Sequence, residues 1–227
     1  AFAISGDLGF NPLEDELTAA DGSKFKLDPP PQAGLPKKGF SAVEFGYIDA
    51  EEQRKLGDVQ VAIAAGSERL EALAPFNRWD GKDFESMPVL LKSAGKCTTD
   101  HISPAGPWLR YRGHIDRISD NMFSGANNCF ATAPGAGINT STGEVGKLSA
   151  IARDYKKRGI GWLVVGDLNY GEGSSREHAA MSPRFLGCKV VIARSFARIH
   201  ETNLKQQGLL ALTFVNSVDY ELIKATD

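Results

Sequence analysis

Short apolar runs alternate with polar and amphipathic segments through the second half of the chain. Four of these runs are rich in aliphatic and β-branched residues and too short for helices, so each predicts a buried strand: Val89–Lys92, Trp162–Val165, Val190–Ala193 and Leu209–Phe214. Between the last two runs, Ser195 is expected to cap a helix over Phe196–Gln207, which Gly208 stops. Strands that alternate with helices indicate an α/β fold.

The first third of the chain lacks this alternation. Residues 1 to about 28 mix apolar pieces with Asp-Gly and Gly-Ser turns, and Asp28–Gly39 is too rich in proline and glycine for regular structure. Ala50–Leu73 has only modest helical character. We therefore expect residues 1–75 to run extended along a surface, with the chain entering a compact region around Leu70–Trp79.

Composition excludes several classes of protein. With 227 residues, 42% of them apolar and 24% charged, the chain has the make-up of a soluble domain of ordinary size plus an arm. A net charge of -2 and a pI near 6.1 predict neither nucleic acid nor an anionic membrane as a partner. No apolar run reaches the roughly 18 residues of a membrane helix. Three scattered cysteines argue against a disulfide framework and fit a reducing compartment.

The richest candidate chemistry lies in Tyr170–Ala180, directly after the run that ends at Gly166. Ser174 and Glu177 stand three residues apart at the start of an expected helix over Arg176–Met181, so they match a capping box. This structural reading competes with a functional one, because a capping box requires neither a second serine nor an arginine.

The functional reading is an anion site. Glycines at 171 and 173 indicate a backbone that approaches something closely or adopts a positive φ. First-turn amides and the helix dipole favour negative charge, and Arg176 can form a bidentate pair with a carboxylate. A serine in such a turn could bind an anion or lose its own proton.

A second polar cluster, Lys96–Trp108, holds too few periodic apolar residues for a strand or helix and is expected to be a loop. Asp100 and His101 could form an acid/base pair, but adjacent residues on an extended segment point in opposite directions, so one of them is expected to be structural. His101 is more typical of a satisfied turn histidine than of a catalyst. Arg110 and Arg112 share one face if the chain is extended there.

Four blocks of sequence carry a family resemblance. They read G-K-C-T-T-D-H-I-S, G-P-W-L-R-Y-R-G-H, Y-G-E-G-S-S-R-E-H-A-A and A-R-S-F-A-R-I-H-E-T-N-L-K-Q-Q-G-L-L. In order and spacing they resemble the C-terminal half of mitochondrial-type aconitases, with clear similarity from about Phe76 to about Tyr220. The opening Ala1–Leu8 also resembles this family, where it closes the third domain.

The resemblance implies the fold and the domain boundaries. Residues 76–227 are expected to form the family's swivelling β/β/α domain, a sheet with surrounding helices that docks over the first three domains and closes the cleft. Residues 1–75 are expected to be the remnant of the preceding domain plus the interdomain linker. The chain stops at Asp227, where an aconitase would continue, so the swivel domain is expected to be incomplete at its C-terminal end.

The resemblance also implies a reaction, the reversible dehydration of citrate to cis-aconitate and its rehydration to isocitrate. Ser174 would be the base, working as an alkoxide, and Asp100 would be a further catalytic residue. Three groups, Ser175, Arg176 and Arg112, would hold substrate carboxylates. Ser103 matches another substrate-binding position, whereas His101 inherits no catalytic role.

The family's four-iron four-sulfur (4Fe-4S) cluster is expected to lie outside this chain. Three cysteines carry that cluster, two of them in a close pair, but here Cys97, Cys129 and Cys188 form no C-x-x-C pair and match no ligand position. Cys97 would be a non-ligand cysteine near the site, and Cys188 begins a buried strand. No metal is expected on this fragment alone, and its partners would be the substrate and the cluster-bearing N-terminal domains.

Two further expectations follow. Phe130–Gly143 is richer in Gly, Ala, Thr and Pro than the family segment and is expected to be a flexible surface loop. By resemblance the protein would be mitochondrial if eukaryotic and otherwise cytoplasmic. The alternative function is a catalytically inactive swivel module that serves as a structural or binding subunit; the intact Ser174, Arg176 and Arg112 favour the enzyme.

Overall fold

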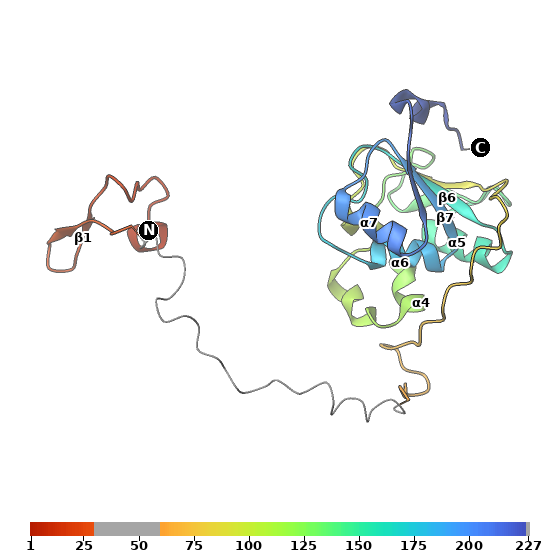
Figure 1. The fold of residues 1–227 in the computed structure, drawn as a ribbon, viewed down its shortest axis with the longest axis horizontal. Helices are drawn as coiled ribbons and strands as arrows, with labels where there is room; N and C mark the ends of the chain where they lie inside the picture. Colours follow the sequence, from red (N-terminus) through yellow and green to blue (C-terminus); the bar gives the residue numbers. More distant parts are fainter. Residues whose placement is uncertain (30–59, 226–227) are drawn as a thin grey trace. The chain divides into compact units, whose positions relative to one another are not determined.

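The computed structural model describes residues 1–29 and 60–225, which fall into two units with a division after Gln60 (Figure 1). The first unit contains helix α1 (Phe2–Ser5) and an antiparallel pair, β1 (Leu17–Thr18) with β2 (Lys24–Phe25). Most of the predicted irregular segment Asp28–Gly39 and the first part of Ala50–Leu73 lie outside the described residues. Residues 60–73 contain no helix.

A parallel sheet of four strands forms the centre of the second unit. Its order is β3-β6-β7-β8, and every neighbouring pair is parallel. The strands are β3 (Val89–Lys92), β6 (Trp162–Gly166), β7 (Cys188–Ala193) and β8 (Leu210–Thr213). The predicted α/β fold and all four strand positions are confirmed.

Three helices pack around this sheet (Figure 1): α5 (Leu148–Lys157), α6 (His178–Phe185) and α7 (Arg198–Gln206). Helix α5 buries Leu148, Ile151 and Tyr155, whose spacing of three and four residues puts them on one face. Trp162 at the start of β6 is fully buried, and its indole donates a hydrogen bond to the Leu186 carbonyl (2.9 Å). In the described part of the chain, no helix has the length and apolarity to cross a bilayer.

Strand β8 differs from its prediction because it is not buried. It is one of the two edge strands of the sheet, and its Leu210 and Leu212 are 47% and 46% exposed, whereas β3 at the other edge is buried at every residue. The sequence run could not distinguish an edge strand that other elements cover from one that is left uncovered. Leu209, just before it, is buried.

The start of α7 also differs from its prediction. Ala197 precedes the helix and provides no side-chain cap, whereas the Ser195 hydroxyl accepts a hydrogen bond from the Asn169 amide (2.8 Å). Phe196 forms a β-bridge with Tyr170, so this stretch is extended and the helix cannot begin there. Gly208 has a φ of 72° and ends the helix as predicted.

The expected surface loop Phe130–Gly143 contains a strand instead. Strand β4 (Ala136–Ile138) pairs antiparallel with β5 (Val145–Lys147), and Gly135, Gly137 and Asn139 are buried. A Cβ atom on Gly137 would lie 2.6 Å from Leu148 Cδ2, so glycine allows this strand to approach α5 closely. At Gly137, therefore, the small residue that suggested a loop allows close packing of β4 against α5.

The C-terminal segment that contains Tyr220 packs against the carboxyl ends of the strands through a hydrogen bond and cation–π contacts. In the 3-10 helix η4 (Ser217–Leu222), the Tyr220 hydroxyl donates to the Ser93 carbonyl (2.6 Å). Lys92 Nζ and the Arg194 guanidinium lie 4.4 and 4.3 Å from the centre of the Tyr220 ring. Two cations against one ring favour this position of η4.

Candidate active site

The serine turn, residues 170–177, forms the larger part of the irregular connection from β6 to α6. Gly171 has a φ of 82°, and a Cβ atom there would overlap the His200 ring; Gly173 has a φ of 114°. Both predicted reasons for glycine, a positive φ and a close approach, are therefore confirmed at Gly171. A side chain at that position would push the turn off α7.

The predicted capping box is wrong. Helix α6 begins at His178, its N-cap is Glu177, and no side chain caps it. Ser174 therefore lies before the helix and does not bond to a first-turn amide. Main-chain hydrogen bonds join the serine turn to the segment beside it instead.

A capping box does occur in that neighbouring segment, at α3 (Thr99–Ile102). Thr98 Oγ1 accepts from the His101 amide, and His101 Nδ1 accepts from the Thr98 amide, both at 3.2 Å. The prediction of a structural His101 is confirmed, whereas the expected loop over Lys96–Trp108 is only partly right. Two short helices interrupt it, α3 and the start of the 3-10 helix η2 (Gly106–Tyr111), and residues 96–98 and 103–105 are irregular.

Main-chain hydrogen bonds hold the serine turn against the α3 segment. The Gly171 amide donates to the Cys97 carbonyl (2.8 Å), and the Thr99 amide donates to the Glu172 carbonyl (2.9 Å). Lys96 Nζ lies 2.9 Å from Glu172 Oε1, and this hydrogen bond lowers the pKa of Glu172. Two segments that are distant in the sequence thus form one site.

Arg176 connects these segments through its side chain. Its Nη1 lies 2.6 Å from Asp100 Oδ1 and donates to the Ser103 carbonyl (2.8 Å). The structure therefore brings together three predicted site residues, Asp100, Ser103 and Arg176. The Ser103 side chain is buried and its hydroxyl faces Asn121 Oδ1 at 3.5 Å, so its contact with Arg176 is through the main chain.

Ser174 and Ser175 are exposed, and their hydroxyls bond to no described residue. The Ser174 carbonyl accepts from Thr99 Oγ1 (2.8 Å). Within the described chain, the amides of residues 173–178 donate no hydrogen bond. A run of free amides beside an arginine is a set of donors suited to an oxyanion.

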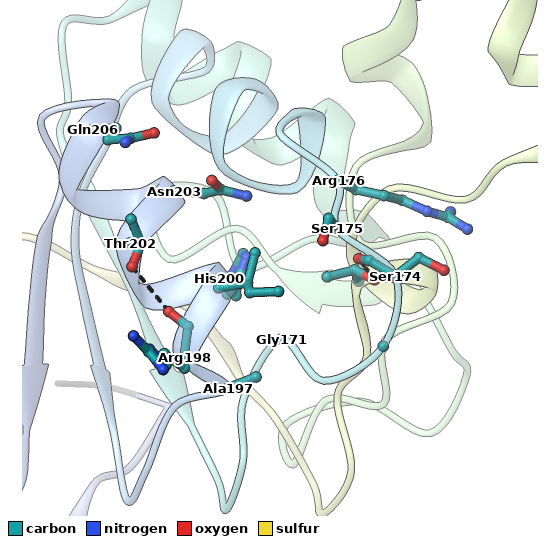
Figure 2. Close-up of a pocket in the computed structure, with 13 residues that line it drawn as sticks. Gly171, Ser174, Ser175, Arg176, Ala197, Arg198, His200, Thr202, Asn203 and Gln206 are labelled. Atoms are coloured by element: carbon teal, nitrogen blue, oxygen red, sulfur yellow. Dashed lines mark hydrogen bonds between the residues drawn. The ribbon is translucent and has the colours of Figure 1, made fainter. Parts of the chain in front are cut away.

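The serine turn faces α7 across a pocket (Figure 2). The volume of this pocket is about 580 Å³. The turn contributes Ser174, Ser175 and Arg176 to its wall, and the opposite wall comes from α7. Sequence reasoning missed the α7 residues as part of the site: Arg198, Ile199, His200, Thr202, Asn203 and Gln206. The lining contains two arginines and no aspartate or glutamate. Its charge therefore suits an anionic ligand.

His200 lies beneath the turn. It is 2% exposed, its ring centre is 5.4 Å from that of Tyr170, and neither ring nitrogen has a hydrogen-bond partner among the described residues. Burial lowers the pKa of His200 to about 4, so the imidazole is neutral near neutral pH. The only sequence signal for it was its place in the fourth family block.

Arg112 is not part of the pocket lining. It follows η2 as an exposed residue, and its guanidinium bonds to no described side chain. Its carbonyl lies 2.9 Å from His178 Nε2, which places its main chain beside the start of α6. Arg110 pairs with Glu68 (3.2 Å). The condition for a shared face of Arg110 and Arg112, an extended chain, is not met, because Arg110 lies in η2 and Arg112 is its C-cap.

The cysteines do not suit an iron–sulfur cluster. Cys97 and Cys188 are buried, and burial raises the pKa of Cys97 to about 12 and that of Cys188 further, so both thiols stay protonated. Cys129 is exposed, with Sγ 3.4 Å from the Tyr220 hydroxyl. Over residues 1–29 and 60–225, no group of three His, Cys, Asp or Glu side chains could hold a metal ion. As predicted, Cys188 begins a buried strand and Cys97 adjoins the site.

Comparison with known proteins gives one family. The family model described as "Aconitase C-terminal domain" matches residues 87–217. A Caenorhabditis elegans protein named "Probable aconitate hydratase, mitochondrial" is 56% identical over 227 residues, which are all of this chain and 29% of that relative. A Dictyostelium discoideum protein of the same name is 55% identical over 227 residues, with the same coverage.

A third relative, from Saccharomyces cerevisiae, is named "Aconitate hydratase, mitochondrial". It is 53% identical over 227 residues, again all of this chain and 29% of the relative. The chain therefore spans less than a third of the length of the curated relatives that it matches.

Proposed function

The chain belongs to the aconitase family, and from this membership we propose that it is the C-terminal part of an aconitate hydratase, which interconverts citrate and isocitrate through cis-aconitate. The observation that carries the proposal is the serine turn: an unbonded Ser174 hydroxyl, free main-chain amides and Arg176 beside a pocket without acidic side chains. This arrangement has the donors that a carboxylate substrate and a serine base both need.

Arg176 and Ser175 are the proposed ligands of one substrate carboxylate. A guanidinium is permanently charged and its planar fork matches a carboxylate. Asp100 and the Ser103 carbonyl occupy Nη1 of Arg176, which fixes the plane of the fork. We therefore propose that Asp100 orients Arg176; the expected catalytic role of Asp100 stays a prediction beside this one. Arg112, exposed and unpaired with described side chains, is free to take another carboxylate.

Ser174 is the proposed base that removes the proton from the substrate carbon. A neutral serine is a poor base, so the site must stabilise its alkoxide. The amides of residues 175–177 donate no hydrogen bond to described groups and follow Ser174 directly, and Arg176 adds positive charge. Preformed donors of this kind stabilise developing negative charge because they need no reorganisation during the reaction.

The remaining parts of the enzyme are assigned by family membership. The cysteines of this chain do not fit a 4Fe-4S cluster, so we place that cofactor and its ligands in preceding domains that this chain does not include, and no step above passes through it. We assign residues 76–227 to the swivelling domain and residues 1–75 to the end of the preceding domain plus the linker. The names of the relatives support a mitochondrial location.

The test uses the full-length protein with its cluster reconstituted, assayed for formation of cis-aconitate from citrate and isocitrate. We expect turnover by the wild type, and a loss of about 10³-fold or more in kcat for Ser174→Ala with an unchanged fold. Ser141→Ala, which removes another exposed hydroxyl outside the pocket, is the matched control. Substantial activity in Ser174→Ala would remove Ser174 from the base role; no turnover by the loaded wild type would favour the inactive module.

A further inference from the structure

One side chain from outside the serine turn holds the middle of that turn. On its N-terminal side, the Gly171 amide bonds to Cys97, and on its C-terminal side Arg176 pairs with Asp100. Residues 173–175 have no such main-chain bond to a neighbouring segment. The hydrogen bond from Thr99 Oγ1 to the Ser174 carbonyl (2.8 Å) is what links these three described residues to α3.

Thr99 is itself fixed in place. It is 2% exposed, its amide donates to the Glu172 carbonyl (2.9 Å), and it begins a helix that is closed by a capping box. Its hydroxyl therefore has little freedom to follow the turn. A Cβ atom on Gly173 would lie 3.3 Å from Thr99 Oγ1, so the turn passes close over this hydroxyl.

The bond sets the direction of a whole peptide group. The described chain has no cis peptide bond, so the Ser174 carbonyl and the Ser175 amide point in opposite directions. Because Thr99 holds the carbonyl toward α3, the Ser175 amide must point away from α3. This amide is one of the free donors that directly follow the Ser174 hydroxyl.

We propose that Thr99 is the positioning residue of the serine turn: its hydroxyl fixes the Ser174–Ser175 peptide so that the base and the donor that stabilises it are held in one arrangement. The inference rests on the proposed function, because it assigns Thr99 to the reaction through Ser174. Thr99 itself exchanges no proton with the substrate. Its loss should therefore reduce the rate of the chemical step more than substrate binding.

The experiment compares Thr99→Val and Thr99→Ser in the full-length enzyme with its cluster. Valine keeps the shape and removes the donor, whereas serine keeps the donor. We expect Thr99→Val to lower kcat by about 10- to 100-fold with KM within about 2-fold, and Thr99→Ser to stay within about 3-fold of the wild type. Thr140→Val is the control, since it removes a threonine hydroxyl that bonds to Tyr155 (2.9 Å) outside the pocket.

Each contrary result has a distinct meaning. A normal kcat in Thr99→Val, while Ser174→Ala is inactive, overturns the positioning role and leaves the proposed function standing. A raised KM with normal kcat assigns Thr99 to substrate binding instead, which also overturns it. If the wild type has no turnover, the proposed function fails. A crystal structure of Thr99→Val then tests the positioning role by itself, and a Ser174–Ser175 peptide in its original orientation would refute that role.

Discussion

Arg176 and Asp100 form the ion pair that joins the serine turn to α3. Arg176 Nη1 lies 2.6 Å from Asp100 Oδ1, and the Arg176 side chain is 19% exposed while that of Asp100 is 57% exposed. Asp100 therefore contacts Arg176 from the side that faces solvent. A pair of this kind contributes little to stability where solvent screens it, but it restricts the direction of the guanidinium.

Arg176→Lys should impair substrate binding although the charge is kept. A single ammonium group cannot contact Asp100, the Ser103 carbonyl and a substrate carboxylate in the same geometry. We expect KM for citrate to rise by about 10- to 100-fold, because a rise of this size corresponds to the free energy of the lost hydrogen bonds between charged groups. Steady-state kinetics of the full-length enzyme measure this. Arg158→Lys, at an exposed pair with Asp154 (3.1 Å), is the control, and equal KM values in the two variants would refute the role of Arg176.

Arg112→Gln tests the arginine that lies outside the pocket. Its guanidinium bonds to no described side chain, so its removal should leave stability unchanged within about 0.5 kcal/mol. We expect KM for citrate to rise by about 10-fold or more, because a charged ligand of a carboxylate is lost. The neighbouring Arg110→Gln breaks an exposed pair with Glu68 and should leave KM within about 2-fold. A larger effect from Arg110 than from Arg112 would reverse the assignment.

Gly171→Ala should distort the serine turn. The new Cβ would overlap the His200 ring, and the φ of 82° disfavours any other residue. The left-handed backbone and the overpacking together should cost about 2 to 5 kcal/mol. Chemical unfolding measures the loss, and activity should fall with it. Gly143→Ala has a similar φ of 76° with nothing within 4 Å of its Cβ, so it should cost only about 1 to 2 kcal/mol.

Acid should loosen α7 through His200. The folded state holds the pKa of His200 at about 4 by burial, below the ordinary 6.5. Between these values the unfolded chain binds a proton that the folded chain does not, so stability is full above about pH 6.5 and falls as the pH drops toward 4. The loss should approach about 3 kcal/mol.

Hydrogen exchange of the α7 amides, corrected for the intrinsic effect of pH, measures this loss locally. His200→Leu keeps an apolar group of similar size without a titrating proton, so its α7 should lose less stability between about pH 7 and pH 4. The same pH dependence in both proteins would show that another group is responsible.

The strands were predictable because buried strands such as β6 and β7 contain runs of consecutive aliphatic residues. Val164 and Val191, for example, are at most 1% exposed. The exposure of β8 was not predictable, because Leu210 and Leu212 look the same in sequence whether or not a further element covers them. The hydrophobic pattern thus identifies a strand, whereas the exposure of that strand depends on which other elements pack against it.

The site was predictable in its residues more than in its geometry. The glycines correctly indicated an unusual backbone, but Ser174 and Glu177 also fitted a capping box. The structure excludes that capping box because α6 begins only at His178, while main-chain hydrogen bonds join the turn to the α3 segment. The α7 wall of the pocket escaped prediction because the fourth family block contains His200 and Asn203 but gave neither of them a role. Local patterns cannot reveal contacts between segments that meet only in the folded chain.

The bond between Thr99 and Ser174 joins residues that are 75 positions apart. Closing a loop of this length costs conformational entropy, and contacts of long range slow folding for that reason. A ribosome that adds about 5 to 20 residues per second exposes Thr99 about 4 to 15 seconds before Ser174. During synthesis the α3 segment therefore exists for seconds without the turn that it will hold, and the serine base is assembled only after β6 has been made and can lie beside β3.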